Sequence, residues 1–138
     1  GVEAIVENWK LLSFYHDEVQ IRLQRMEQIT QDSLLAFAMI RLTITKKTLQ
    51  YLYPHLIDNN DKGTAALAAK LLNQHLLVRG SVRFDWDSVN ERVVRLESKF
   101  DILSPILKLV GSLENVVRVF EEALVTPEGR FLLIDKIK

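Results

Sequence analysis

Three histidines are the residues best suited to metal binding or proton transfer, and each stands alone. His16, His55 and His75 have no second His or carboxylate at the spacing of a zinc motif. In a helix, His16, Asp17 and Glu18 point in different directions and cannot easily chelate one ion together. We therefore expect no metal site and expect His16 to be a buried structural residue. The alternative is a pH-sensitive switch, because an unperturbed imidazole titrates near about 6.5.

No arrangement of residues is typical of a catalytic centre. Glu121 and Glu122 are adjacent rather than paired across a cleft, and no nucleophile elbow accompanies the Ser, His and Asp residues. The chain contains no Cys, which excludes thiol nucleophiles, thiolate metal sites and disulfides. We predict that the protein is not an enzyme and has no catalytic residue, no metal and no cofactor.

Three residues are candidates for ligand binding: Arg22, Arg25 and Trp86. Arg22 and Arg25 lie three residues apart on one face of an expected helix, so both guanidinium groups can hold one carboxylate or phosphate. Solvated surface arginines are the alternative. Trp86 stands between two aspartates just before another expected helix, where an exposed ring can line a ligand or partner site. A hydrophobic staple onto that helix is the alternative.

The elements that must position these residues are expected to be long helices. Two stretches of the chain have seam residues at alternating steps of three and four, which predicts one buried stripe along a helix in each. In the first stretch these residues are Val2, Ile5, Trp9, Leu12, His16, Val19, Leu23 and Met26. In the second stretch they are Val89, Val93, Leu96, Phe100, Leu103, Leu107 and Val110.

The whole chain is expected to be helical between short breaks. Helices are predicted over 3–31, 33–57, 65–79, 88–110, 113–124 and 127–138, with a short extended link over 82–86. Capping or breaking residues separate them at Asp32-Ser33, 58–63, Gly80-Ser81, Asp87-Ser88 and Gly111-Ser112. The predicted fold class is all-α, an elongated up-and-down bundle of five to six helices. We expect one domain over 1–138, excised from a longer protein because both ends look cut.

Charge and hydropathy narrow the range of partners. The 18 Lys and Arg residues balance 18 Asp and Glu residues, so the chain lacks the overall basic field of a nucleic-acid-binding protein. No apolar run approaches the roughly 20 residues that span a bilayer. We predict no nucleic-acid partner and no membrane insertion within these residues. Segment 62–84 carries four basic residues and no acid; it is either an anion-binding patch or a partner for the acidic first helix.

The first expected helix has more apolar surface than one stripe, because Leu11, Phe14 and Tyr15 flank its seam. A wider apolar sector implies contacts on two sides. We predict a homodimer with these three residues in the interface, since two-fold dimers are the commonest closed assembly. The alternative is that helices from segment 33–80 cover the second side within one chain.

A resemblance to a known family lies in residues 87–104, DSVNERVVRLESKFDILS. This run resembles the second long helix of helical periplasmic sensor domains of bacterial transmembrane receptors of the histidine kinase and diguanylate cyclase type. Asn8-Trp9 followed by Glu18 and Arg22 is similar to their first helix. The resemblance implies an extracytoplasmic domain of an inner-membrane protein that senses a small ligand or a protein partner in signal transduction.

The competing hypothesis comes from a different class of protein. It is an intracellular helical protein-interaction module, such as an adaptor, a secretion chaperone or a viral regulatory protein, located in the cytoplasm. Such a module binds a helix of another protein in a groove of the bundle. The neutral charge and the lack of catalytic groups fit this hypothesis equally well.

Overall fold

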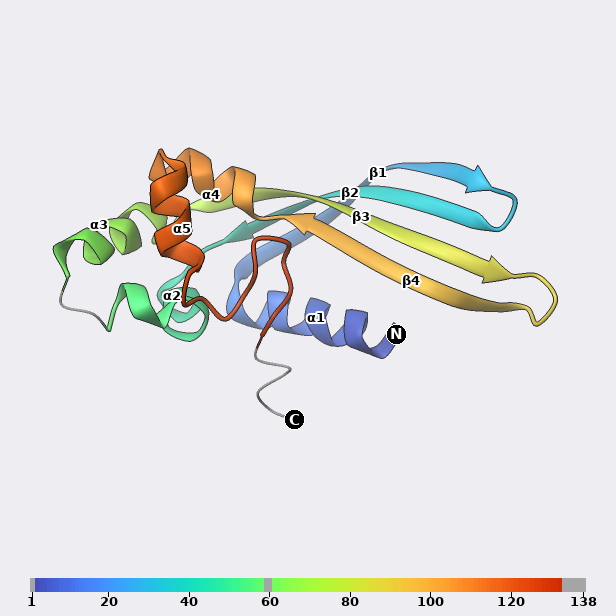
Figure 1. Cartoon of the computed structure of the whole chain (residues 1–138), viewed down its shortest axis with the longest axis horizontal. Coiled ribbons are helices and arrows are strands. Elements are labelled where there is room, and N and C mark those ends of the chain that lie inside the picture. The colour runs from blue at the N-terminus through green and yellow to red at the C-terminus, as the bar shows by residue number, and fades with distance from the viewer. Residues whose placement is uncertain (1, 59–60, 133–138) are drawn as a thin grey trace.

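The chain folds as a mixed α/β structure, and the prediction of an all-α bundle is wrong. The computed structural model describes residues 2–58 and 61–132, with side chains from residue 6 onward. One antiparallel sheet has the strand order β1-β2-β3-β4; most of the helices gather at one end of it, and the N-terminal helix runs below its middle (Figure 1). The elements are α1 (Val2–Tyr15), β1 (Asp17–Thr30), β2 (Ser33–Thr43), α2 (Lys46–Leu52), the 3-10 helix η1 (Pro54–Leu56), α3 (Lys62–Leu71), β3 (His75–Asp87), β4 (Arg92–Asp101), α4 (Leu103–Val110) and α5 (Leu113–Phe120). None of the described helices combines the length and the apolar character needed to cross a bilayer.

The helix expected over 3–31 is instead α1 followed by β1. The chain leaves the helix at His16, and Glu18 has a positive φ of 53°. Beyond that point Val19, Ile21 and Leu23 alternate with polar residues, a period of two that suits a strand with one apolar side. Val19 and Leu23 fit both the helical spacing of three and four residues and the strand spacing of two. The pairing of β1 with β2 selects the strand.

The second long helix, expected over 88–110, is a hairpin turn followed by β4 and α4. β-Branched Val93 and Val94 favour a strand, and Leu96 and Phe100 lie on one side of it. Val89 and Val93 are 88% and 42% exposed, so they form no buried seam. The segment that carries the resemblance to sensor domains is therefore mostly strand in this protein.

The other expected helices also divide differently. Segment 33–57 forms β2, α2 and η1, and segment 65–79 contains the end of α3 and the start of β3. Gly80-Ser81 lies inside β3 rather than after a helix. Residues 127–132 form a turn closed by a bridge between Val125 and Phe131, and residues 133–138 lie outside the described residues.

Two of the predicted breaks, Asp32-Ser33 and Asp87-Ser88, are real but close hairpins rather than cap helices. The Asp87 carboxylate accepts hydrogen bonds from the backbone N–H groups of Val89 and Asn90 at 3.0 and 3.3 Å. A short carboxylate can cap a helix or close a turn with the same hydrogen bonds. Two breaks separate helices as expected: Asp61, within the break at 58–63, caps α3, and Gly111, in the left-handed region with φ 87°, and Ser112 end α4 and start α5.

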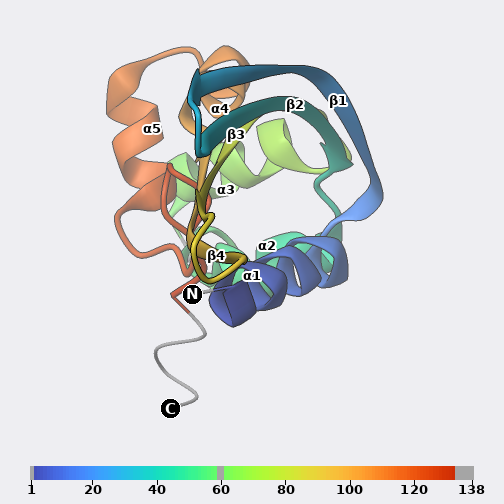
Figure 2. The same ribbon diagram turned by 90° about the vertical axis from the view of Figure 1, so that its right-hand side faces the viewer.

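The hydrophobic core lies between the inner half of the sheet and the helices. We call the core-facing side of the sheet the helix side. Its inner positions are at most 2% exposed and are occupied by Ile40, Leu42, Leu76 and Val78. They belong to one cluster with side chains of α3, α4 and α5. The outer halves of the two hairpins extend beyond the helices (Figure 1), and the end-on view shows that the strands curl above α1 (Figure 2).

Phe100 joins three parts of the fold. Its ring meets the edge of Trp9 from α1, with the centroids 5.3 Å apart. Gly80 is opposite it on β3, and a Cβ atom there would lie 2.7 Å from the Phe100 ring. A Cβ atom at Gly129 would lie 2.9 Å from Phe100 Cβ. Phe100 therefore fits in this place because neither Gly80 nor Gly129 has a side chain.

The residues expected at a dimer interface lie on α1 with different surroundings. Phe14 is 59% exposed, and the Lys47 ammonium lies 3.5 Å from its ring centroid. Tyr15 packs near Tyr51 of α2, with the centroids 5.6 Å apart, and Leu11 is partly buried against the core. Part of this side of α1 is thus covered by α2 of the same chain. An interface on α1 stays a prediction.

His16 is a buried structural residue, as expected. It is 4% exposed, and its Nδ1 lies 3.0 Å from the carbonyl oxygen of Leu12. Burial lowers the pKa of His16 to about 4, because the charged imidazolium loses its hydration, and the contact with the Leu12 carbonyl offsets this only in part.

Replacing Gly80 by Ala should destabilise the fold by about 1–3 kcal/mol, because the new methyl group overlaps the Phe100 ring. Chemical denaturation measures this loss. Gly63→Ala is the matched control: its Cβ would meet only the mobile end of Arg118 and the Asp61 side chain. Combining Gly80→Ala with Phe100→Leu should recover part of the loss. Equal stability of Gly80→Ala and wild type would contradict the packing described.

Lowering the pH from 7 to 5 should cost about 2 kcal/mol of stability through His16. The unfolded imidazole binds a proton near about 6.5, whereas the folded one stays neutral down to about 4. This contribution is therefore complete above 6.5 and declines as the pH falls toward 4. Denaturation of wild type and His16→Gln at several pH values tests it: the variant should lose this dependence, and parallel curves would refute it.

Candidate functional site

A groove crosses the middle of the sheet on the side opposite the core, which we call the groove side. Its volume is about 1320 Å³. Five cationic side chains and one carboxylate line it: Arg22, Arg25, Arg41, Arg79, Lys99 and Asp101. We call it the basic groove. All four strands contribute to it, so it exists only in the assembled sheet.

Strand register explains why these cations share one side. Arg22 pairs with Met39, which pairs with Arg79 on β3. One row farther out, Arg25 pairs with Phe37 of β2. Residues that are paired across an antiparallel ladder lie on the same side of the sheet. The rows therefore form a grid of positive charge, and neighbouring strands are about 4.8 Å apart.

A β-bulge brings Arg22 and Arg25 together. Residues three apart on a regular strand point to opposite sides. The register of β1 shifts between Leu23 and Arg25, however, so Arg22 and Arg25 pair with Met39 and Phe37, which are two apart. The prediction that both arginines share a face is therefore confirmed, although a bulge and not a helix is the cause.

Four of the five groove cations have no ion pair among the described residues: Arg22, Arg41, Arg79 and Lys99. Arg25 alone pairs, with Glu27 at 3.1 Å, and its guanidinium also covers the Phe37 ring at 4.3 Å from the centroid. Asp101 accepts hydrogen bonds from the backbone and the hydroxyl of Ser104. Cations that outnumber the carboxylates in this way favour an anionic ligand.

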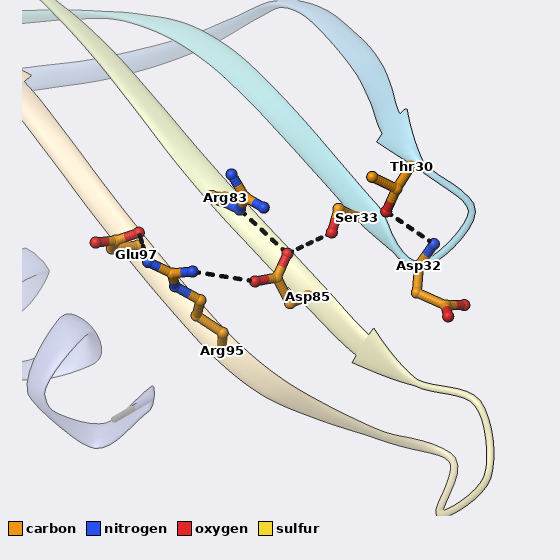
Figure 3. Close-up of polar contacts among 7 residues, drawn as sticks. All are labelled: Thr30, Asp32, Ser33, Arg83, Asp85, Arg95 and Glu97. Carbon is orange, nitrogen blue, oxygen red and sulfur yellow. Dashed lines mark hydrogen bonds and ion pairs between the residues drawn. The ribbon is translucent and has the colours of Figure 1, made fainter.

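Farther out on the same side, the charges are neutralised within the protein (Figure 3). Asp85 accepts a hydrogen bond from the Ser33 hydroxyl at 2.6 Å and one from Arg83 at 3.1 Å. Arg95 lies 3.7 Å from Asp85 and 3.1 Å from Glu97. The Ser33 hydroxyl above all, and then Arg83 and Arg95, hold the pKa of Asp85 below its ordinary value. This Asp85 network ties β2, β3 and β4 together.

Trp86 lies in a different place from the two arginines. It is 44% exposed and lines a separate hollow of about 440 Å³ near the hairpin ends. Met26, Leu34 and Phe84 share that hollow, and they belong to the helix side of the sheet. The structure therefore brings Arg22 and Arg25 together and separates Trp86 from them.

Three groove residues were missed in the sequence: Arg41, Arg79 and Lys99. The excess of basic residues in segment 62–84 signalled Arg79, but it also pointed to Lys62 and Lys70, which lie on α3 away from the groove. Nothing in the sequence relates Arg41 to Lys99, since only the pairing of four strands places them together.

Comparison of the chain with protein-family models, with curated proteins and with solved structures finds no match. In the part of the chain that the structure describes, no three His, Asp or Glu side chains are grouped to hold a metal ion.

Ser33→Ala should raise the pKa of Asp85, because the hydroxyl is the strongest of the groups that stabilise its charged form. An NMR titration of the side-chain carboxyl carbons measures this pKa directly. Thr30→Val is the control: Thr30 accepts a hydrogen bond from the Asp32 backbone and does not contact Asp85. An unchanged Asp85 titration in Ser33→Ala would show that the network is not as described.

Proposed function

We propose that this protein is a non-catalytic protein-interaction module whose basic groove binds an extended, acid-rich segment of a partner polypeptide. The observation that carries this proposal is the set of four groove cations without ion pairs among the described residues: Arg22, Arg41, Arg79 and Lys99. They come from four different strands, so a ligand that contacts all of them must extend across the sheet.

The size of the groove favours an extended chain over a small molecule. Its volume of about 1320 Å³ exceeds the roughly 300–1,000 Å³ that is usual for small-ligand pockets. A peptide with acidic side chains on one face can place a carboxylate near each cation, and arginine binds carboxylates in a bidentate geometry.

An acidic peptide fits the groove better than a single-stranded nucleic acid does. Bases stack on open aromatic faces in single-strand binding sites. The Phe37 ring is covered by the Arg25 guanidinium, and the Phe100 ring packs against Trp9 and Gly80. The formal net charge of zero also lacks the basic field of nucleic-acid-binding proteins.

The proposal keeps the interaction-module hypothesis but changes its surface from a helical groove to a sheet. Extracytoplasmic sensing stays a prediction. The resemblance that implied it rests on a second long helix, whereas residues 88–110 form a turn, a strand and a short helix. We propose the chemistry of the partner, an acid-rich segment, and specify neither its identity nor the compartment.

Binding of a fluorescent glutamate peptide of about ten residues, followed by anisotropy, tests the proposal. Arg79→Gln combined with Lys99→Gln should weaken binding about 30-fold, at roughly 1 kcal/mol for each lost charge contact. Binding should also weaken with added salt, since the Debye length falls from about 10 Å at 0.1 M to about 3 Å at 1 M.

The matched control removes the same charge from the same side of the sheet. Arg83→Gln combined with Arg95→Gln takes away two cations that already have carboxylate partners, so the affinity should change less than about twofold. Equal losses in both double variants would reduce the effect to overall charge and contradict the proposal. Tighter binding of a thymidine oligonucleotide of the same length would assign the groove to nucleic acid instead.

A further inference from the structure

β1 is an open edge of the sheet. It pairs with β2 on one side, and no element among residues 2–58 and 61–132 pairs with its other side. Its 14 residues contain no proline, and all but Val19 are exposed. The opposite edge differs: Phe100 of β4 and Ile102 just after it donate backbone hydrogen bonds to the carbonyl oxygens of Glu128 and Pro127 at 3.3 and 2.9 Å. A long strand with a free edge is a template for another strand.

The residues of β1 are complementary to a second copy of β1. If a two-fold axis passes between Gln24 and Arg25, antiparallel pairing places Arg22 opposite Glu27 of the second copy. The symmetry repeats this pair on the other side of the axis. The same register places Leu23 opposite Met26 of the second copy, again twice.

In this register, the residues that face each other across the interface lie on the same side of the sheet. Arg22 and Glu27 both lie on the groove side, because they pair with Met39 and Leu35 of β2. Leu23 and Met26, which are 59% and 53% exposed, lie on the helix side, where they pair with alanines of β2. Opposite charges would meet on one side and apolar side chains on the other, which is the arrangement that stabilises cross-strand pairs.

The neighbouring registers are poorer. An axis through Gln24 places Arg22 opposite Met26, and these two residues lie on different sides of the sheet. An axis between Leu23 and Gln24 places Arg22 opposite Arg25, and like charges directly across a ladder are destabilising. The charge pattern of β1 therefore selects one pairing.

We propose that two copies of this protein associate through their β1 edges, in the register that pairs Arg22 with Glu27, to form one continuous eight-stranded sheet. Glu27 now pairs with Arg25 of its own chain at 3.1 Å, and both side chains are more than half exposed, so Glu27 can exchange partners at little cost. The two basic grooves would lie side by side across the axis. Arg22 belongs to both surfaces: the dimer would pair it with Glu27, and Arg41, Arg79 and Lys99 would remain for an acidic peptide, with no ion pair among the described residues. The interface differs from the one on α1 that the sequence suggested.

Sedimentation velocity over about 1–100 µM tests the proposal by charge reversal. Wild type should sediment at twice 15.9 kDa. Arg22→Glu alone and Glu27→Arg alone each place like charges opposite each other and should weaken the dimer at least about tenfold. The double variant Arg22→Glu/Glu27→Arg should restore dimerisation, because each pair is then reversed. Lys108→Glu, on the exposed face of α4, is the control and should change nothing.

A cross-link tests the register without changing charge. The chain has no Cys, so Leu23→Cys and Met26→Cys each introduce the only thiol of their copy. The two thiols are placed on separate copies, Leu23→Cys mixed with Met26→Cys, so that no disulfide can form within one chain, whereas across the proposed interface they face each other at a Cα separation that a disulfide can bridge. Oxidation should give a covalent dimer, and Ile21→Cys mixed with Met26→Cys should give much less. A wild-type monomer at about 100 µM, or a dimer indifferent to both charge reversals, would overturn the proposal.

Discussion

The contact between Phe100 and Gly80 is the point on which the arrangement of sheet and helices depends. The ring can lie across β3 only because Gly80 has no side chain there. From that position it meets Trp9 of α1 and approaches Gly129 of the C-terminal segment. One side chain thus connects the N-terminal helix, the β3–β4 hairpin and the C-terminal segment of the described chain. Phe100 lies in β4 between Lys99 and Asp101, which line the basic groove on the opposite side of the sheet, so the packing that joins the layers also holds the strand that carries these two groove residues.

Beyond this junction the sheet projects without helical cover, and its stability must come from the strands themselves. The Asp85 network meets this need by linking three strands through one carboxylate. It also divides the groove side into two electrostatic regions. In the outer region arginines and carboxylates neutralise each other, whereas in the middle four cations remain without ion pairs among the described residues. This contrast within one surface is why the basic groove, and not the whole sheet, is the candidate site.

The bulge in β1 connects the site with the sheet edge. By shifting the register between Leu23 and Arg25, it keeps both arginines on the groove side and both Leu23 and Met26 on the helix side. A regular strand with Arg22 and Leu23 in the same places would put both Arg25 and Met26 on the wrong side. The single irregularity therefore sorts the charged and apolar residues of a strand that is otherwise open to solvent, and it gives the edge its self-complementary pattern.

The sequence by itself determined the features that depend on local chemistry. Hairpin or helix ends at Asp32-Ser33, Asp87 and Gly111-Ser112 follow from short polar side chains and from glycine, whatever elements they separate. The burial of His16 and the helix near 113–124 were predicted correctly, whereas Arg22 and Arg25 share a side through a β-bulge and not through the helix on which that prediction rested. Whether residues 17–43 and 75–101 are helix or strand was decided only by tertiary structure. Their apolar residues fit a seam of steps three and four as well as an alternation of two, and a strand is stable only when its partner supplies hydrogen bonds. The grouping of Arg41, Arg79 and Lys99 depends on the same pairing, because residues far apart in the chain become neighbours only through strand register.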